Sequence, residues 1–173
     1  TGAWISTVFE EGADIAIAPL PLYHIFCLTA TLSFMKWGAL NVLVTNPRDL
    51  PALVRELGHW KWTIMTGVNT LFNGLLNTPG FDKLDFSTLK AVIGGGAAVQ
   101  EAVAKRWQQV TGHYLTEGYG LTEASPVACA MSVAVAQASA MARAAKTSAR
   151  IVASILRTSG WSMIGPICRR SAA

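Results

Sequence analysis

Charge is scarce in this sequence and unevenly placed. Charged side chains make up only 14% of the 173 residues, and no acidic residue lies beyond Glu123. Residues 1–130 carry eight Lys/Arg and ten Asp/Glu, whereas residues 131–173 carry six Lys/Arg and no acid. A nucleic-acid-binding protein normally presents its basic residues on a folded face. Because the basic excess belongs here to one terminal segment, we expect no nucleic-acid partner.

Cysteine is also scarce, and no leader segment is evident. Cys27, Cys129 and Cys168 are odd in number and widely spaced, which excludes a disulfide framework and a zinc site and favours a reducing compartment. The first residues lack a basic start followed by an apolar run, so we expect no signal peptide. Residues 124–142 are uncharged but mostly Ala and Ser, too weakly apolar to insert into a bilayer. We expect a cytoplasmic protein, with peripheral contact at the inner membrane as the alternative.

The first 130 residues alternate between strand-like and helix-like patterns. DIAIAPL, ALNVLVT, KWTIMTG, LKAVIGGG and HYLTEGYG are typical of strands, and amphipathic or apolar helical stretches separate them. Asp49 suits a helix start with Pro51 in the first turn, and Gly38, Gly58 and Gly112 suit helix ends. This repetition predicts the α/β class, a parallel sheet flanked by helices. Ligands of such sheets bind at the carboxyl ends of the strands.

Three consecutive glycines, Gly94 to Gly96, follow one predicted strand. Without side chains, backbone amides can approach a ligand closely. The alternative is a strand-to-helix turn that needs a positive φ. The P-loop pattern GxxxxGK[ST] is absent from the sequence.

The stretch EGYGLTE, residues 117–123, combines glycines with groups that a magnesium-nucleotide site uses. Tyr119 lies between two glycines, so a flat base could stack on its ring. Thr122 offers a hydroxyl to a phosphate, and Glu123 offers a hard oxygen ligand to Mg²⁺. The alternative is a tight turn whose tyrosine packs in the core. His24, in PLYHIF, lies just past a strand end and is either catalytic or a hydrogen-bonded structural residue.

PLYHIF, GGG and YGLTE, in this order and spacing, resemble the adenylate-forming acyl-CoA synthetase superfamily. Within it, TNPRDLPALVRELG, TGVNTLFNGLLN and EGYGLTEASP are similar to bacterial long-chain fatty acid–CoA ligases, and the match is nearly continuous over residues 14–126. Such enzymes join a carboxylate to AMP from ATP, release pyrophosphate and pass the acyl group to CoA. The resemblance implies ATP/AMP and Mg²⁺ as cofactors, CoA as co-substrate and a fatty acid as substrate.

The resemblance also assigns roles to individual residues. His24 would lie beside the reacting carboxylate, Val68 and Gly95 would line the acyl pocket, and Glu123 would hold Mg²⁺. His24, Thr122 and Glu123 would form the catalytic set. The residues that would bind the nucleotide are Gly94, Gly95, Gly96, Ala97, Glu117, Gly118, Tyr119, Gly120, Leu121 and Thr122.

Several parts of the family pattern are absent from these 173 residues. The Thr/Ser/Gly-rich phosphate loop, the ribose-binding aspartate and the catalytic lysine are not found. We therefore expect residues 1–130 to be part of an AMP-binding domain that is inactive alone and that either self-associates through exposed sheet edges or covers those edges with the tail. The alternatives are another acyl- or aryl-CoA synthetase of the superfamily, or a non-catalytic nucleotide-binding or structural remnant.

Residues 131–173, a basic Ala/Ser/Arg-rich tail, depart from the family. They could form a membrane-surface helix, a helix docked on the sheet, or the product of a reading-frame shift. A shift of two bases turns the Met163–Ile164 codon pair into an Asp codon. Over residues 160–164 the shifted frame permits Leu-Val-Asp-Asp, similar to an acidic strand of the family. We favour a frameshift near residue 131.

Overall fold

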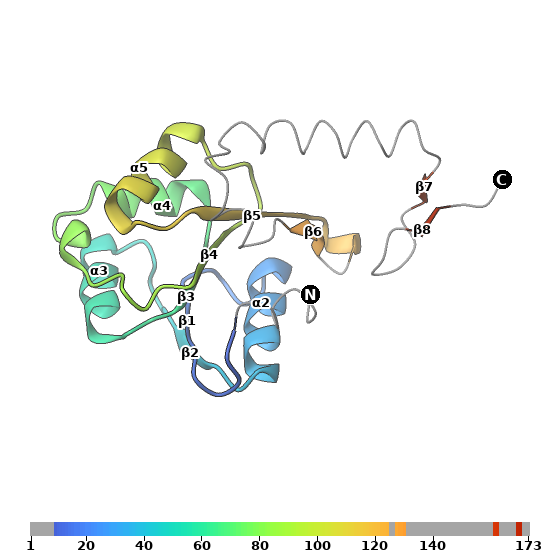
Figure 1. The fold of residues 1–173 in the computed structure, drawn as a ribbon, viewed down its shortest axis with the longest axis horizontal. Helices are drawn as coiled ribbons and strands as arrows, with labels where there is room; N and C mark the ends of the chain where they lie inside the picture. Colours follow the sequence, from blue (N-terminus) through green and yellow to red (C-terminus); the bar gives the residue numbers. More distant parts are fainter. Residues whose placement is uncertain (1–8, 125–126, 131–160, 163–168, 171–173) are drawn as a thin grey trace. The chain divides into compact units, whose positions relative to one another are not determined.

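The computed structural model describes residues 9–124, 127–130, 161–162 and 169–170 (Figure 1). The chain divides into two compact units, Thr1–Ala138 and Ser139–Ala173. In the second unit, strand β7 (Trp161–Ser162) pairs antiparallel with strand β8 (Arg169–Arg170). Most of the tail predicted from the sequence lies outside the described residues. The candidate site belongs to the first unit.

The first unit is built on a six-stranded sheet in the order β2-β1-β3-β4-β5-β6. The first five strands in this order run parallel, as predicted, and β6 pairs antiparallel with β5. The strands are β1 (Ile15–Ala18), β2 (Leu40–Leu43), β3 (Ile64–Gly67), β4 (Ala91–Gly94), β5 (Leu115–Gly120) and β6 (Val127–Ala130). The α/β class is confirmed, and β6 is an addition that the sequence pattern did not reveal.

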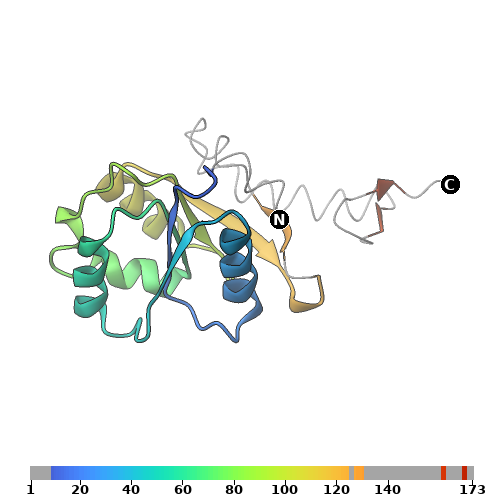
Figure 2. The ribbon, with the colours of Figure 1, turned by 90° about the horizontal axis from the view of Figure 1, so that it is seen from below.

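Helices cover both faces of the sheet unequally. Figure 2 shows α2 (Ile25–Lys36) on one face and α3 (Leu50–His59), α4 (Asn69–Leu76) and α5 (Glu101–Thr111) on the other. Alternate strand residues supply the two cores, because successive side chains point to opposite faces. Ile17, Met65 and Val92 pack with α3, α4 and α5. Ala16, Ile64, Ala91 and Ile93 pack with α2 through Phe34 and its neighbours.

Most predicted helix ends are confirmed, and one is wrong. The Asp49 carboxylate accepts the Ala52 N–H at 3.0 Å, and Gly112 follows α5 with a φ of 77°. Gly58 does not end α3, which continues to His59. The side chains of His59 and Trp60 bond to groups four residues earlier, Nδ1 of His59 to the Arg55 carbonyl and Nε1 of Trp60 to the Glu56 carboxylate. Helix α3 thus extends one residue past the glycine, and these two contacts stabilise its last turn.

The EGYG segment is strand, as predicted for HYLTEGYG, and the alternative of a tight turn is wrong for it. Strand β5 continues through Gly120 because β6 pairs with its second half, Gly118 opposite Ala130 and Tyr119 opposite Cys129. The chain turns only afterwards, in the short 3-10 helix η2 (Thr122–Ala124). A second short 3-10 helix, η1 (Phe81–Lys83), follows α4. No helix in the part of the chain that the structure describes is long and apolar enough to cross a membrane.

Candidate nucleotide site

The site is built at the carboxyl ends of three neighbouring parallel strands. Gly67 of β3 lies opposite Gly94 of β4, and Gly94 lies opposite Glu117 of β5. The Gly94 carbonyl oxygen lies 3.9 Å from where a Cβ on Gly118 would be. The sheet therefore brings the two glycine motifs together, as their predicted position at strand ends implied.

The fold itself accounts for each of the three consecutive glycines. A Cβ on Gly94 would lie 2.8 Å from Val99 Cγ2, and a Cβ on Gly95 would lie 3.0 Å from the Phe26 ring. Gly96 has open space around it but a φ of +78°, which L side chains rarely adopt. Steric crowding explains the first two positions and backbone conformation the third.

The turn after β4, residues 95–100, still offers backbone groups to a ligand. Gly96 and Ala97 are exposed, and among the described residues no hydrogen bond occupies their amides. Free N–H groups at the end of a parallel strand can bind an anion or a polar ring edge. Recognition by this turn would therefore come from the backbone, with no charged side chain contributed by the turn.

Two hydrogen bonds attach this turn to the segment that follows β3. The Gly95 N–H donates to the Gly67 carbonyl at 3.2 Å, and the Gln100 N–H donates to Asn69 Oδ1 at 2.9 Å. Val68, the residue expected in the acyl pocket, lies between these two acceptors and is partly buried.

Glu117 is the most perturbed acid at the site. Its side chain is partly buried, and this burial raises the pKa of the Glu117 carboxyl above its ordinary value, while a hydrogen bond with the Val99 backbone opposes the rise. Burial disfavours the charged carboxylate because it removes water. Glu117 therefore links β5 to the end of the glycine turn.

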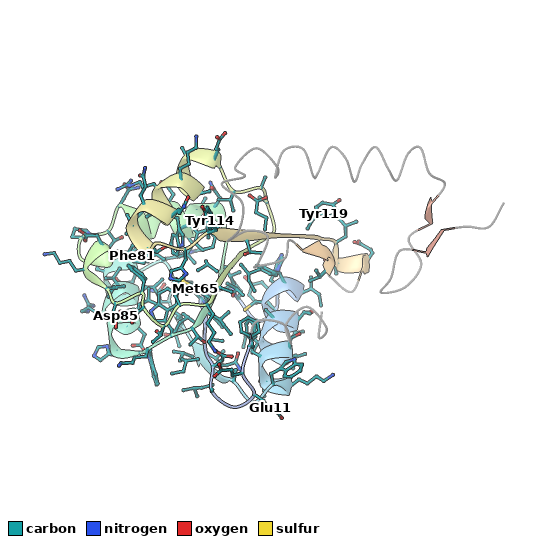
Figure 3. The ribbon with its side chains drawn as sticks, viewed as in Figure 1. Glu11, Met65, Phe81, Asp85, Tyr114 and Tyr119 are labelled. Atoms are coloured by element: carbon teal, nitrogen blue, oxygen red, sulfur yellow. The ribbon has the colours of Figure 1, made fainter. Side chains whose placement is uncertain are left out.

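The rest of the EGYGLTE motif is exposed to solvent. Tyr119 has 61% of its surface exposed, and Leu121, Thr122 and Glu123 are exposed as well. Figure 3 shows Tyr119 and Tyr114 at separate positions, with Tyr119 beyond the body of the sheet. An open ring agrees with the predicted stacking platform. Within the described ranges, no hydrogen bond or ion pair joins Thr122 or Glu123 to the glycine turn, so the structure does not bring these two predicted residues to the cluster.

Metal binding would rest on few protein ligands. Across residues 9–124 and 127–130, no group of three or more His, Cys, Asp or Glu side chains gathers as a metal site. Mg²⁺ commonly takes one or two carboxylates and completes its shell with water and substrate phosphates. The exposed carboxylate of Glu123 could be such a single protein ligand for Mg²⁺. The described residues do not form a site with several protein ligands.

His24 begins helix α2 as its N-cap. Its Nδ1 accepts the Phe26 N–H at 3.2 Å, so the neutral ring carries its proton on Nε2. This bond fulfils the structural alternative foreseen for His24 and leaves Nε2–H as a donor on an exposed side chain. Phe26, two residues later, packs against Gly95. Helix α2 thus ties the PLYHIF motif to the glycine turn.

Four further residues lie near the site and were not predicted from the sequence. Phe26 and Asn69 contact the turn. Their only sequence signal is that they lie in the same motifs as His24 and Val68. Thr66 and Thr116 lie on either side of Ile93 in the ladder and have buried hydroxyls without a hydrogen-bond partner. Their alternation with apolar residues is a weak signal, because threonine is common in strands.

Comparison with known proteins finds a family and closely similar relatives. The family model described as AMP-binding enzyme matches residues 1–168. A long-chain-fatty-acid–CoA ligase of Salmonella typhimurium is 56% identical over 121 residues, and one of Yersinia pestis is 53% identical over 121 residues. Each alignment covers 69% of this chain and 22% of the relative. The chain thus spans about a fifth of the length of these curated relatives.

Solved structures share the fold. The N-terminal domain of FACL13 from Mycobacterium tuberculosis superposes with a TM-score of 0.69 at 21% identity, covering 79% of this chain and 34% of that domain. The anthranilate CoA ligase AuaEII in complex with anthranoyl-AMP gives a TM-score of 0.66 at 22% identity, covering 73% of this chain and 25% of that one. At these identities the likeness supports the architecture alone.

Proposed function

Because this chain belongs to the AMP-binding enzyme family, we propose that it is a segment of a long-chain fatty acid–CoA ligase. The parent enzyme would convert a fatty acid, ATP and CoA into acyl-CoA, AMP and pyrophosphate through an acyl-adenylate. The observation that carries this proposal is the 53–56% identity to such ligases over 121 residues.

The proposed roles follow from the chemistry available at the strand ends. The backbone of Gly94, Gly95, Gly96 and Ala97 would bind the adenosine and the acyl-adenylate, since the amides of Gly96 and Ala97 are open. The Tyr119 ring would stack on adenine, with Glu117, Gly118, Gly120 and Leu121 shaping the surrounding strand. These groups hold two anionic reactants in line, which lowers the barrier by positioning.

The remaining roles concern the reacting atoms. His24 would donate from Nε2 to the substrate carboxylate, and Val68 and Gly95 would border the acyl chain. Thr122 would donate its hydroxyl to a phosphate oxygen, and Glu123 would hold Mg²⁺. When bound, Mg²⁺ supplies positive charge that neutralises the phosphates during adenylation. CoA would enter as the thiol acceptor of the second step.

Nucleotide binding is the first test. We expect calorimetry with Mg²⁺ to detect AMP or ATP binding to the 173-residue chain, and Tyr119→Ala to weaken it about tenfold or more, because aromatic stacking on a base contributes about 1–3 kcal/mol. Tyr114→Ala, the same change at the start of β5, is the matched control. Equal effects of the two substitutions would contradict the stacking role.

Catalysis is tested by a chimera. Residues 14–123 would replace the aligned segment of the Salmonella ligase, and thioester formation with a long-chain acid would be measured. We expect activity in the chimera and at least a hundredfold loss with Glu123→Gln, on the scale of losing one charge-stabilising group. The 173-residue chain alone is expected to form no thioester. An inactive but folded chimera would contradict the proposed function and favour a non-catalytic remnant.

The location, partners and domain limits belong to the same proposal. We propose a cytoplasmic location with peripheral contact at the inner membrane, tested by sedimentation with anionic vesicles. Self-association would occur through exposed sheet edges.

Residues 1–130 would form the AMP-binding part. Residues 131–173 would be a frameshift product, and sequencing the gene is expected to reveal a family-like reading frame after a shift of one or two bases.

A further inference from the structure

Asn69 makes a long-range hydrogen bond from an unusual position. It is the first residue of α4 and follows the N-cap Val68, which cannot supply the side-chain cap that a short polar residue often gives a helix. Its Oδ1 instead accepts the Gln100 N–H at 2.9 Å, 31 positions further along the chain. Gln100 is the N-cap of α5 and makes no side-chain cap bond. Asn69 thus bonds to the start of a neighbouring helix instead of capping its own.

The Gln100–Asn69 bond attaches the end of the glycine turn to residues 67–69, and the same segment also bonds the start of the turn. Gly95 donates to the Gly67 carbonyl at 3.2 Å, only two residues before Asn69. Val68, between the two acceptors, has its Cγ1 3.8 Å from the position that a Cβ on Gly96 would take. The three residues 67–69 therefore hold both ends of the turn and face its middle.

We propose that Asn69 is a positioning residue that fixes the nucleotide-binding turn relative to Val68. Its amide oxygen sets where the end of the turn lies, and thereby how far the adenosine site lies from the acyl pocket. The proposal rests on the proposed function for its consequence in nucleotide binding. The positioning itself concerns only the chain's own contacts.

Two substitutions separate the lost hydrogen bond from a general loss of packing. Asn69→Ala removes the acceptor. Asn69→Asp keeps an oxygen acceptor of the same reach and adds negative charge near the start of α4, where the helix dipole favours it. A positioning role therefore predicts that Asp restores what Ala loses.

Asn77 offers a matched control on the same helix. It is the C-cap of α4, and its Oδ1 accepts from Arg106 Nη1 at 2.7 Å. Arg106 belongs to α5 and also donates from Nη2 to the Leu76 carbonyl at 2.8 Å. Asn77→Ala therefore breaks an α4–α5 link of the same residue type at the end of α4 remote from the glycine turn.

The experiment is amide hydrogen exchange, measured by NMR on the 173-residue chain and its three variants under native conditions. Loss of the Asn69 bond predicts exchange about fivefold faster in Asn69→Ala at the Gln100 amide, which it binds, and at the hydrogen-bonded Gly95 amide at the other end of the turn. Asn69→Asp and Asn77→Ala are expected to keep the wild-type rates there. Equal acceleration in Asn69→Ala and Asn77→Ala, or no rescue by Asp, would overturn the proposal.

AMP titration of the same four proteins tests the consequence for nucleotide binding. If the wild type binds AMP, we expect Asn69→Ala alone to weaken binding about fivefold, in step with the exchange rates. Unchanged affinity with accelerated exchange would overturn the nucleotide consequence. If the wild type does not bind AMP, the proposed function of this chain fails, and the exchange rates still decide whether Asn69 positions the turn.

Discussion

At the scale of single residues, adding one methyl group at the site has effects that depend on the surroundings. A Cβ on Gly67 would lie 2.6 Å from the ring of Phe72, which is completely buried. We expect Gly67→Ala to lower the free energy of unfolding by about 1–3 kcal/mol through overpacking. Gly96→Ala has space but a φ of +78°, so we expect a loss of about 1–2 kcal/mol. Chemical denaturation measures both, and a neutral Gly67→Ala would contradict the packing described here.

Glu117 predicts a pH dependence at the same scale. Because burial raises the pKa of its carboxyl, the folded protein binds this proton more tightly than the unfolded chain does. Its contribution to stability is therefore full below the ordinary carboxyl pKa and is lost as pH rises through the raised pKa. Glu117→Gln does not ionise, so we expect its Tm to exceed that of the wild type at about pH 7 but not at about pH 4.

Thermal melts at both pH values measure this difference. Glu123→Gln, at an exposed position, makes the same change of net charge and serves as the control. A constant difference between Glu117→Gln and wild type across this range would contradict a burial effect at Glu117.

At the scale of elements, two helix glycines should respond oppositely to alanine. Gly58 lies inside α3 without a positive φ, and an added Cβ would be 3.5 Å from Leu84, an ordinary contact. We expect Gly58→Ala to stabilise the protein by about 0.5–1 kcal/mol, since Gly is the poorer helix former. Gly112 ends α5 with a φ of +77°, so Gly112→Ala should destabilise it. Urea unfolding of both variants tests the two signs.

Sequence patterns were sufficient to predict helix ends that depend on contacts between neighbouring residues. Asp49 at the start of α3 and Gly112 at the end of α5 act through neighbours in sequence, and both were predicted correctly. HYLTEGYG was predicted as a strand, but local signals could not exclude a tight turn there, because glycines at 118 and 120 taken alone favour one. The continuation of β5 through Gly120 depends on pairing with Val127–Ala130, which was not predicted. Long-range pairing therefore overrode a local preference.

The part of the site that could be predicted from the sequence is the part that depends on where the strands end. The meeting of Gly94 with Glu117 follows from placing both motifs at the ends of adjacent parallel strands. The bond from Gln100 to Asn69 could not be inferred, because it joins positions 31 residues apart and Asn at a helix start normally suggests a local cap. Exposure of Thr122 and Glu123 likewise depends on where η2 leads the chain.

At the scale of the whole molecule, apolar side chains remain exposed on one side of the sheet. Leu28, Leu32 and Met35 share one face of α2 at a spacing of four and three residues, and are 38%, 55% and 60% exposed. Leu43 of the neighbouring edge strand β2 is 52% exposed and points to the same face as α2, since its neighbour Val42 packs in the core on the opposite face. Such a surface favours association.

We expect analytical ultracentrifugation to detect concentration-dependent self-association of the 173-residue chain. Leu32→Lys combined with Met35→Lys should weaken it by placing charge on the apolar face of α2. Ala102→Lys combined with Gln109→Lys adds the same charge to exposed positions of α5 and is the control. If both pairs weaken association equally, net repulsion is the cause and the α2 face is not the contact.

The strand order also determines when the site can exist during synthesis. From β1 the sheet grows through β3, β4 and β5 in the order in which these strands leave the ribosome. Gly94, opposite Gly67, comes about 27 residues after it, and Glu117, opposite Gly94, about 50 residues after it, so at about 5–20 residues per second the nascent chain waits roughly 3–10 s for Glu117. During that interval strand β5 has not yet been added to the growing sheet. Chaperone dependence should therefore be greatest before Glu117 is translated.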